Sequence, residues 1–465
     1  MCLIDVVTIF DVLDEKAPLS IRTNLPTMKK ITLTIILLLA VFGNLIAQQE
    51  KGITGYNNWL SSWTEFKPNK VDYDEATQIL SGDISESMTL SKRNTYLLLG
   101  DVFVTNNATL TIEPGTVIIG DFKTKGSLTI SRGSKIIANG SQTDPIVFTS
   151  SRTDKKQGDW GGLFILGNAP INTLSNVSAL NYGLRPSSTA YINYGGNDPY
   201  SNSGILKFVR VEFAGKNTKE FGNFNGITLA GVGLKTTIQN VMVSYCEGNS
   251  FSILGGEVVI EKAVSFRSKN NDYKFNYGTQ CNIVNSLAVR SPYISSADGS
   301  RCIYVSSYDT KEEVSSSKKQ THVNAENLTL LNVSNDIKGD IAIGLVQEAI
   351  YIGPDVSITM NKNVISGFKP AILLDREIVI NNENLEKIKF TRTYFNNCKG
   401  NIFRKGFSNN DDLESWYGSR AFNNVYSKGP DSETFINSES NKDPDFRLRI
   451  NKIIASNDYF DDDED

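Results

Sequence analysis

The chain reads TLTIEPGTVII over residues 109–119 and SLTISRGSKII over residues 127–137. At an offset of 18 residues, the two segments match at Leu110/Leu128, Ile112/Ile130, Gly115/Gly133 and Ile118/Ile136. Each segment alternates apolar and polar residues, turns at the glycine, and then alternates again. This pattern indicates two short strands joined by a tight turn. We therefore expect a chain built from repeated short strands.

The repeat continues further along the chain with a period of about 22 residues. The recurring positions are Ile238/Ile260/Ile283, Met242/Val264/Leu287, Asn240/Lys262/Asn285, Phe251/Tyr273, Ile253/Phe275, Gly256/Gly278, Asn249/Asn271 and, at 21 residues, Cys281/Cys302. A period near 20 without a helical pattern is typical of a β-solenoid, whose coils stack about 4.8 Å apart. A propeller blade would need a repeat about twice as long, and a sandwich gives no stacks at fixed offset. We predict an all-β solenoid with coils of about 18–23 residues and irregular N- and C-terminal caps.

Several runs of the sequence carry a family resemblance. They are LKFVRVEFAG (206–215), NGITLAGVG (225–233), TIQNVMVSY (237–245), FSILGG (251–256), DPIVFT (144–149) and GDWGGL (158–163), together with residues 110–115. Over roughly residues 90–310 the chain resembles exported bacterial right-handed parallel β-helix proteins, whose fold is similar to that of the pectin-lyase-like superfamily. The resemblance implies a right-handed parallel β-helix and export, and it implies no particular reaction.

The N-terminal region carries the pattern of a secretory signal. Residues 28–47 begin with Met28, Lys29 and Lys30, continue as an apolar run, and end near Ala47. The run is too short for a comfortable membrane span, although a buried core helix is the alternative. We expect residues 1–27 to be a non-native extension and the exported chain to start near Gln48, in the periplasm, at the outer surface or outside the cell, with no transmembrane segment left.

The remaining segments are assigned by their composition. We expect residues 48–90 to form an N-terminal cap, residues 91–400 the β-helix with an insertion at 170–203, and residues 401–465 a C-terminal cap with an acidic tail. The polar loop at 309–321 shows no evident chemistry. A formal charge of −4, from 47 basic and 51 acidic residues, gives no pull toward nucleic acid.

Histidine and cysteine usage limits the chemistry. The single histidine, His322, excludes a site with several histidine ligands and makes a histidine-dependent nucleophile unexpected. Export permits disulfides, but four cysteines in so long a chain do not form a disulfide scaffold. We expect buried free thiols at Cys246, Cys281, Cys302 and Cys398.

The catalytic candidates are charged residues. Alternation along the strand around residues 208–213 turns Arg210 and Glu212 outward, with Asp272 and the Asp298/Arg301 pair as possible neighbours in a groove. Glycoside hydrolysis needs two carboxyl groups facing one groove at roughly 5–10 Å. The competing interpretation is an exposed ion pair between coils, which is commonplace.

The binding candidates are aromatic residues of the insertion. Tyr191, Tyr194 and Tyr200 have flat apolar rings with polar tips that suit stacking on sugars, and a loop packed on the flank is the alternative. In the proteins that the chain resembles, the turns matching Glu247 and Asp272 are rich in Asp. By this resemblance, Glu247 and Asp272 are candidate ligands of a Ca²⁺ site. The alternative is solvated turns with a partial Asn ladder, and no other cofactor is expected.

Two functional hypotheses follow. The first is an exported, non-catalytic scaffold that binds glycan or another surface component. The second is a polysaccharide lyase or glycoside hydrolase acting in a groove on the flank of the β-helix.

Overall fold

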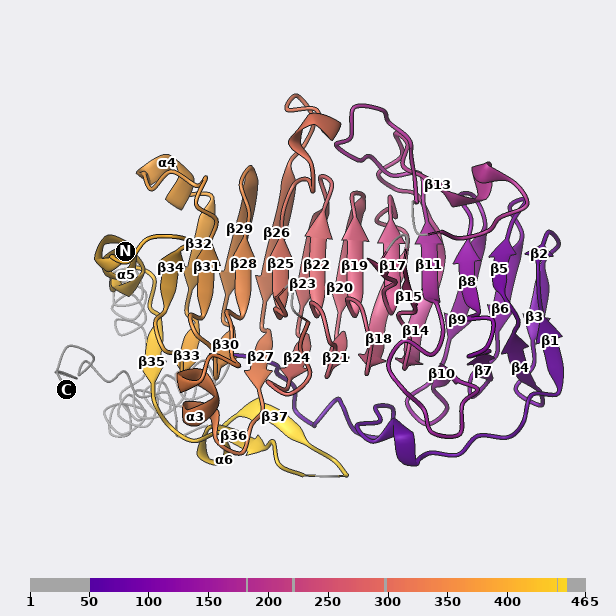
Figure 1. Cartoon of the computed structure of the whole chain (residues 1–465), viewed down its shortest axis with the longest axis horizontal. Helices are drawn as coiled ribbons and strands as arrows, with labels where there is room; N and C mark the ends of the chain where they lie inside the picture. Colours follow the sequence, from indigo (N-terminus) through magenta and orange to yellow (C-terminus); the bar gives the residue numbers. More distant parts are fainter. Residues whose placement is uncertain (1–50, 181–182, 220–221, 297–298, 441, 450–465) are drawn as a thin grey trace, which may run out of the picture. The chain divides into compact units, whose positions relative to one another are not determined.

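The computed structural model describes residues 51–449, apart from 181–182, 220–221, 297–298 and 441. The segments predicted as an extension (1–27) and a signal (28–47) lie outside the described residues, as does the acidic tail at 461–465. The described chain is a parallel β-helix, whose strands lie side by side along its long axis (Figure 1).

One side of every coil belongs to an 11-stranded sheet, called sheet B here. Its neighbouring strands are parallel. They are β2 (Asp83–Ile84), β5 (Asp101–Val104), β8 (Ser127–Ile130), β11 (Gly162–Leu166), β17 (Ile227–Ala230), β19 (Phe251–Leu254), β22 (Tyr273–Asn276), β25 (Ile303–Val305), β28 (Ile350–Ile352), β31 (Ile372–Leu374) and β34 (Ile402–Arg404).

The other two sides form a 20-stranded sheet, sheet A, with two parallel rows. Row A1 contains β3 (Met88–Leu90), β6 (Thr109–Ile112), β9 (Lys135–Asn139), β20 (Glu257–Glu261), β23 (Gln280–Val284), β26 (Thr321–Glu326), β29 (Val356–Asn361) and β32 (Ile388–Thr391). Row A2 contains β1 (Gln78–Leu80), β4 (Thr95–Leu98), β7 (Val117–Gly120), β10 (Ile146–Ser150), β21 (Val264–Phe266), β24 (Leu287–Arg290), β27 (Thr329–Asn332), β30 (Val364–Ser366), β33 (Tyr394–Asn396) and β35 (Val425–Ser427). The longer strands β14 (Gly204–Glu212) and β18 (Thr237–Ser244) pair with both rows.

A single residue turns many coils from row A1 into row A2. Asn240, Lys262 and Asn285, which recur in the sequence, have φ angles of 53°, 53° and 49° at this corner. This is the left-handed region, which Asn tolerates better than most residues.

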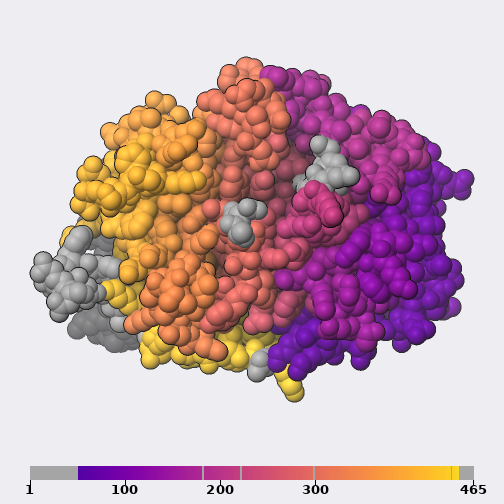
Figure 2. Space-filling model, viewed as in Figure 1, coloured from indigo at the N-terminus to yellow at the C-terminus, as the bar shows by residue number. Residues whose placement is uncertain are grey.

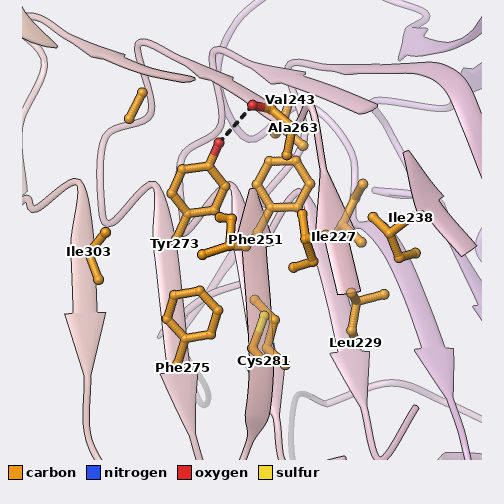
Figure 3. Packing of buried hydrophobic residues seen from close by; sticks show 14 of the residues in the cluster. Ile227, Leu229, Ile238, Val243, Phe251, Ala263, Tyr273, Phe275, Cys281 and Ile303 are labelled. Carbon is orange, nitrogen blue, oxygen red and sulfur yellow. Dashed lines mark hydrogen bonds between the residues drawn. The ribbon is translucent and has the colours of Figure 1, made fainter. Parts of the chain in front are cut away.

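The predicted fold is confirmed, and so are most of the predicted stacks. Ile238 pairs with Ile260 and Ile260 with Ile283, while Phe251 pairs with Tyr273. Figure 3 shows the rings of Phe251 and Tyr273 within the buried core, and they stack with centroids 5.2 Å apart. Stacking of like on like therefore fills the interior of the solenoid.

Two details of the predicted repeat are wrong. Leu110 pairs with Ile136 rather than Leu128, because β6 lies in row A1 and β8 in sheet B. The offset of 18 residues aligned different sides of the coil, which share one alternating pattern, and the true coils are longer in many places. Cys281 lies in sheet A beside Val258, whereas Cys302 precedes a strand of sheet B, so these cysteines do not stack. The four cysteines are unpaired thiols, and Cys398 is only half-buried.

Part of the segment assigned to the N-terminal cap lies along the outer face of row A2, called the flank here, while its residues 78–90 form the strands β1, β2 and β3 of the solenoid. Residues 51–73, called the strap here, run across the outer face of row A2 (Figure 1). Ile53 donates its N–H to the Thr329 hydroxyl at 2.9 Å, and the Phe66 ring packs 5.0 Å from Phe266. The strap lies there because row A2 turns Met242, Val264 and Leu287 outward, and these apolar side chains need cover.

A short helix packs against the core at the far end of the solenoid. Helix α5 (Asp411–Gly418) buries Leu413 and Tyr417 in the main core. The hairpin of β36 (Phe435–Asn437) and β37 (Asp445–Leu448) joins the strap on the flank, where Phe446 contacts Phe66. The remaining elements are η2 (Pro68–Lys70), β12 (Ser178–Ala179), η3 (Thr189–Ile192), β13 (Asn193–Tyr194), β15 (Asn217–Thr218), β16 (Gly222–Asn223), η4 (Lys311–Glu313), α3 (Ile337–Ala342), α4 (Asn382–Leu385) and α6 (Asp431–Thr434). Among the described residues, no helix has both the length and the apolar character needed to span a bilayer.

Candidate functional site

The catalytic candidates Arg210 and Glu212 point outward from β14, as predicted, but the strap covers them. Glu212 is 1% exposed, and its Oε1 lies 3.3 Å from Nε of Arg210. The Arg210 guanidinium donates a 2.7 Å hydrogen bond to the hydroxyl of Tyr73, on the strap. The expectation of an open groove at this pair is therefore wrong.

Burial also sets the electrostatics of this pair. It raises the pKa of the Glu212 carboxyl, while the Arg210 guanidinium acts in the opposite direction. Burial likewise raises the pKa of the Tyr73 phenol. A sealed ion pair with a strap tyrosine over it offers no room for substrate in this arrangement.

Asp272 lies inside the solenoid, apart from Arg210 and Glu212. It is fully buried, and its Oδ2 accepts a 2.9 Å charged hydrogen bond from Arg290. Its Oδ1 accepts a hydrogen bond from Ser265. Burial raises the pKa of Asp272, and the Arg290 charge lowers it. Asp298 lies outside the described residues. Among the described residues, the charged partner of Asp272 is Arg290, and Arg210 and Glu212 are not brought to it.

The turns around Glu247 and Asp272, which were candidates for a Ca²⁺ site, contain a ladder of asparagine side chains. Asn249 donates to Asn225 Oδ1 at 2.7 Å, and Asn271 donates to Asn249 Oδ1 at 2.8 Å. Glu247 pairs with Lys269 at 2.5 Å, while Asp272 is held by arginine. Over the described ranges, no cluster of three His, Cys, Asp or Glu side chains could hold a metal ion. Both carboxylates have cationic partners.

The three insertion tyrosines lie in different environments. Tyr194 is 4% exposed in a cluster with Leu180 and Leu184, and Tyr191 packs against that cluster beside Phe103. These two rings therefore pack on the outer face of sheet B. Tyr200 is 59% exposed and is the one predicted tyrosine free for stacking.

Tyr200 borders a hollow of about 610 Å³. The hollow lies where sheet B leads into row A1, which we call the upper edge and which is at the top of Figure 1. Figure 2 shows the insertion and the loop at 309–321 rising side by side there. Its lining includes Tyr200, Leu234, Asn176, Asn197, Glu257, Gln280, Lys318 and Lys319. An aromatic ring, amides and charges thus face one concave site.

The lysines of this hollow come from the loop in which the sequence showed no chemistry. Lys318 Nζ donates to the carbonyls of Thr173 and Ser175 at 2.6 and 3.2 Å, and to Asn176 Oδ1 at 2.8 Å. The loop is thereby tied to the insertion. Nothing in the sequence indicates this contact, since about 140 residues separate the partners.

A second group of polar residues lies on the outer face of sheet B. Lys274, Tyr304 and Tyr351 occupy neighbouring positions on β22, β25 and β28. The two rings stack 5.1 Å apart, and the Arg301 guanidinium lies 4.9 Å from the Tyr351 ring centroid. Arg301 also pairs with Glu348 at 2.6 Å. Connections of unequal length separate these residues, so no sequence period reveals the row.

The comparison with known protein families agrees with the fold. The sequence profile of the pectate-lyase-like beta helix domain matches residues 82–433. Among solved structures, an alginate lyase from Paenibacillus sp. strain FPU-7 is 12% identical over 76% of this chain and 99% of the lyase, with a TM-score of 0.22. That TM-score is too low to carry residue roles from one protein to the other. No curated protein sequence matches the chain.

Proposed function

The chain belongs to the family of pectate-lyase-like β-helix domains, and from this premise we propose that it is an exported, non-catalytic scaffold that binds glycan at its upper edge. The observation that carries the proposal is the hollow beside Tyr200. Its volume of about 610 Å³ lies within the range of small-ligand sites. Tyr200 offers an exposed ring for a sugar face, with amide and charged groups around it to bond hydroxyls.

The export in this proposal rests on the sequence of residues 28–47. A basic start, an apolar run and a small residue near the cut are the features of a secretory signal. Mass spectrometry of the protein recovered from cells tests it. Export predicts an N-terminus near Gln48 in the periplasmic, surface or culture fraction, and an intact leader in the cytoplasmic fraction contradicts it.

A polysaccharide lyase is the second candidate, and the row on sheet B is the observation that favours it. Lys274 Nζ lies 5.5 Å from the Tyr304 ring centroid, and Arg301 lies 5.8 Å from the same centroid. A lysine near an arginine could supply a base and a neutralising charge for proton abstraction. Burial raises the pKa of Tyr304, so its phenol stays protonated at neutral pH. Lys274 is also held by Asp309 at 3.3 Å, which favours a structural row.

A glycan screen with product analysis separates the two candidates. The purified protein is applied to an array of plant, algal and bacterial polysaccharides, and each bound polymer is then incubated with it and sized. Binding without shortening, weakened about tenfold in Tyr200→Ala and kept in Lys274→Ala, supports the scaffold. Shortened products that disappear in Lys274→Ala support the lyase and overturn the scaffold.

A further inference from the structure

The hollow beside Tyr200 is the first of three along the upper edge. A second, of about 420 Å³, is bordered by Tyr308, Lys311, Gln320 and Asp355. A third, of about 320 Å³, is bordered by Gln320, Asp355, Ser357, Glu377 and Lys387, among others. Gln320 and Asp355 border both the second and the third hollow. Lys318 and Lys319 of the first directly precede Gln320, so the three follow one another along the solenoid.

The floor of this track is periodic. Outward side chains at the starts of β20, β23, β26 and β29 lie in register as Glu257, Gln280, His322 and Ser357. Glu257 and Gln280 border the first hollow and Ser357 borders the third, whereas His322 lies between them in register without bordering a hollow. His322 Nδ1 and Ser357 Oγ are hydrogen-bonded at 2.5 Å. Successive strands are about 4.8 Å apart, which is close to the length of one sugar residue in an extended chain. A polymer of sugars can therefore meet a polar group at each coil.

Aromatic rings stand beside the first two hollows. Tyr200 borders the first, and Tyr308 borders the second, where its hydroxyl donates to Asp355 Oδ2 at 2.8 Å. Both rings lie outside the strands, Tyr200 on the insertion and Tyr308 directly before the loop at 309–321. They are placed to contact different residues of one chain.

The charges along the track nearly cancel. Its lining contains Lys311, Lys318, Lys319 and Lys387 against Glu257, Asp355 and Glu377. Lys387 pairs with Glu383 at 2.9 Å, and Lys311 lies 3.8 Å from Asp355. A balanced lining of amides, hydroxyls and paired charges suits the hydroxyl groups of a neutral glycan. It suits less well a charged glycan that carries a carboxylate or sulfate on each sugar. We propose that the three hollows form one track that binds an extended, neutral glycan of about four or five sugar residues, at one per coil spacing.

This inference rests on the proposed function, and a length series separates the two. Binding constants are measured by calorimetry for neutral gluco-, xylo- and manno-oligosaccharides of two to six residues, with galacturonan and alginate oligomers as the charged comparison. For a neutral series that binds, we expect the pentasaccharide to bind at least about tenfold more tightly than the disaccharide. The affinity should change by less than about twofold between low and physiological salt.

Two variants test the track residue by residue. Tyr308→Ala should reduce the gain with length to less than about threefold and leave the disaccharide affinity unchanged, whereas Tyr200→Ala should weaken every length. Tyr56→Ala, at a fully exposed ring on the strap, is the matched control and should change neither.

Several results would overturn the track. They are an affinity that does not rise with length, a Tyr308→Ala variant that weakens all lengths equally, and tighter, salt-sensitive binding of the charged oligomers. In each case a short ligand that still depends on Tyr200 leaves the proposed function standing. If no glycan binds in a way that depends on Tyr200, both the track and the proposed function are wrong.

Discussion

The flank under the strap is the outer face of row A2, the upper edge borders the start of row A1, and the two differ in what covers them. Row A2 turns Met242, Val264 and Leu287 outward beneath the strap, whereas row A1 turns Gln280 and Ser357 toward the hollows. On the flank, even the charged pair of Arg210 and Glu212 is sealed. An outward-facing residue in a solenoid is therefore not necessarily exposed, because a segment distant in sequence can cover it. The comparison predicts that flank substitutions change stability and that edge substitutions change binding.

The largest effect is expected at the centre of the strap. Trp63 is fully buried, and its ring meets Phe208 edge-on at 5.9 Å. Trp63→Ala should lower the free energy of unfolding by about 4 kcal/mol, because it removes a large buried side chain and leaves a cavity. Urea unfolding measures the change, and Tyr56→Ala on the same strap should stay within about 0.5 kcal/mol of the parent. Equal effects of the two variants would show that the strap does not seal the flank.

The next effect concerns the sealed ion pair. Arg210→Ala leaves the buried Glu212 carboxylate without its cation and should cost about 3 kcal/mol. The double variant Arg210→Met/Glu212→Leu should recover most of that loss, because apolar residues of similar size need no partner. If urea unfolding shows the single variant to be as stable as the parent, the pair is exposed and the description of the flank is wrong.

A smaller effect depends on pH at the C-terminal side of the flank. Burial raises the pKa of Asp431 to about 6, and its Oδ1 accepts a 2.8 Å hydrogen bond from Ser366. The folded state then holds the proton more tightly than the unfolded chain, so the contribution of Asp431 to stability falls as pH rises from about 4 to about 6. Asp431→Asn should remove this part of the slope, about 2 kcal/mol across that window. Unfolding at several pH values checks it, and a parent whose slope is unchanged by the substitution contradicts it.

The smallest energetic change is expected at the open edge, where it affects binding alone. Tyr200→Ala removes a ring that is 59% exposed and should leave the free energy of unfolding within about 0.5 kcal/mol of the parent. Loss of its stacking should weaken glycan binding about tenfold, or about 1.4 kcal/mol. Calorimetry and urea unfolding on the same sample measure both quantities. A variant that binds normally but unfolds easily would place Tyr200 with the buried residues of the flank.

The sequence was sufficient to predict the solenoid because its stacks are local in register. Ile238/Ile260/Ile283 and Phe251/Tyr273 recur at nearly constant spacing, and each stacks on its counterpart. The Asn ladder followed from the same argument, since Asn249 and Asn271 share that spacing. The segments 109–119 and 127–137 could not be assigned to the correct sides of the coil. The strands on all three sides show the same alternation of apolar and polar residues.

The position of the strap over the flank and the hollow beside Tyr200 could not be predicted, because both depend on contacts between segments that are distant in the sequence. Alternation correctly turned Arg210 and Glu212 outward, but it does not say that Tyr73 lies over them. The same limit applies to the insertion, where burial separates Tyr194 from Tyr200. Lys318 reached the site through a loop without a motif, and only its bonds to the insertion reveal its place.

The most direct test of the account is a lysine footprint of the protein with the bound glycan. Amine acetylation is quantified by mass spectrometry at each lysine, with and without the neutral glycan that the screen selects. The account predicts protection of Lys311, Lys318 and Lys319 at the upper edge, with Lys274 and Lys405 on the face of sheet B unchanged. Protection of Lys274 and Lys405, with the edge lysines unchanged, would place the ligand on sheet B and contradict it.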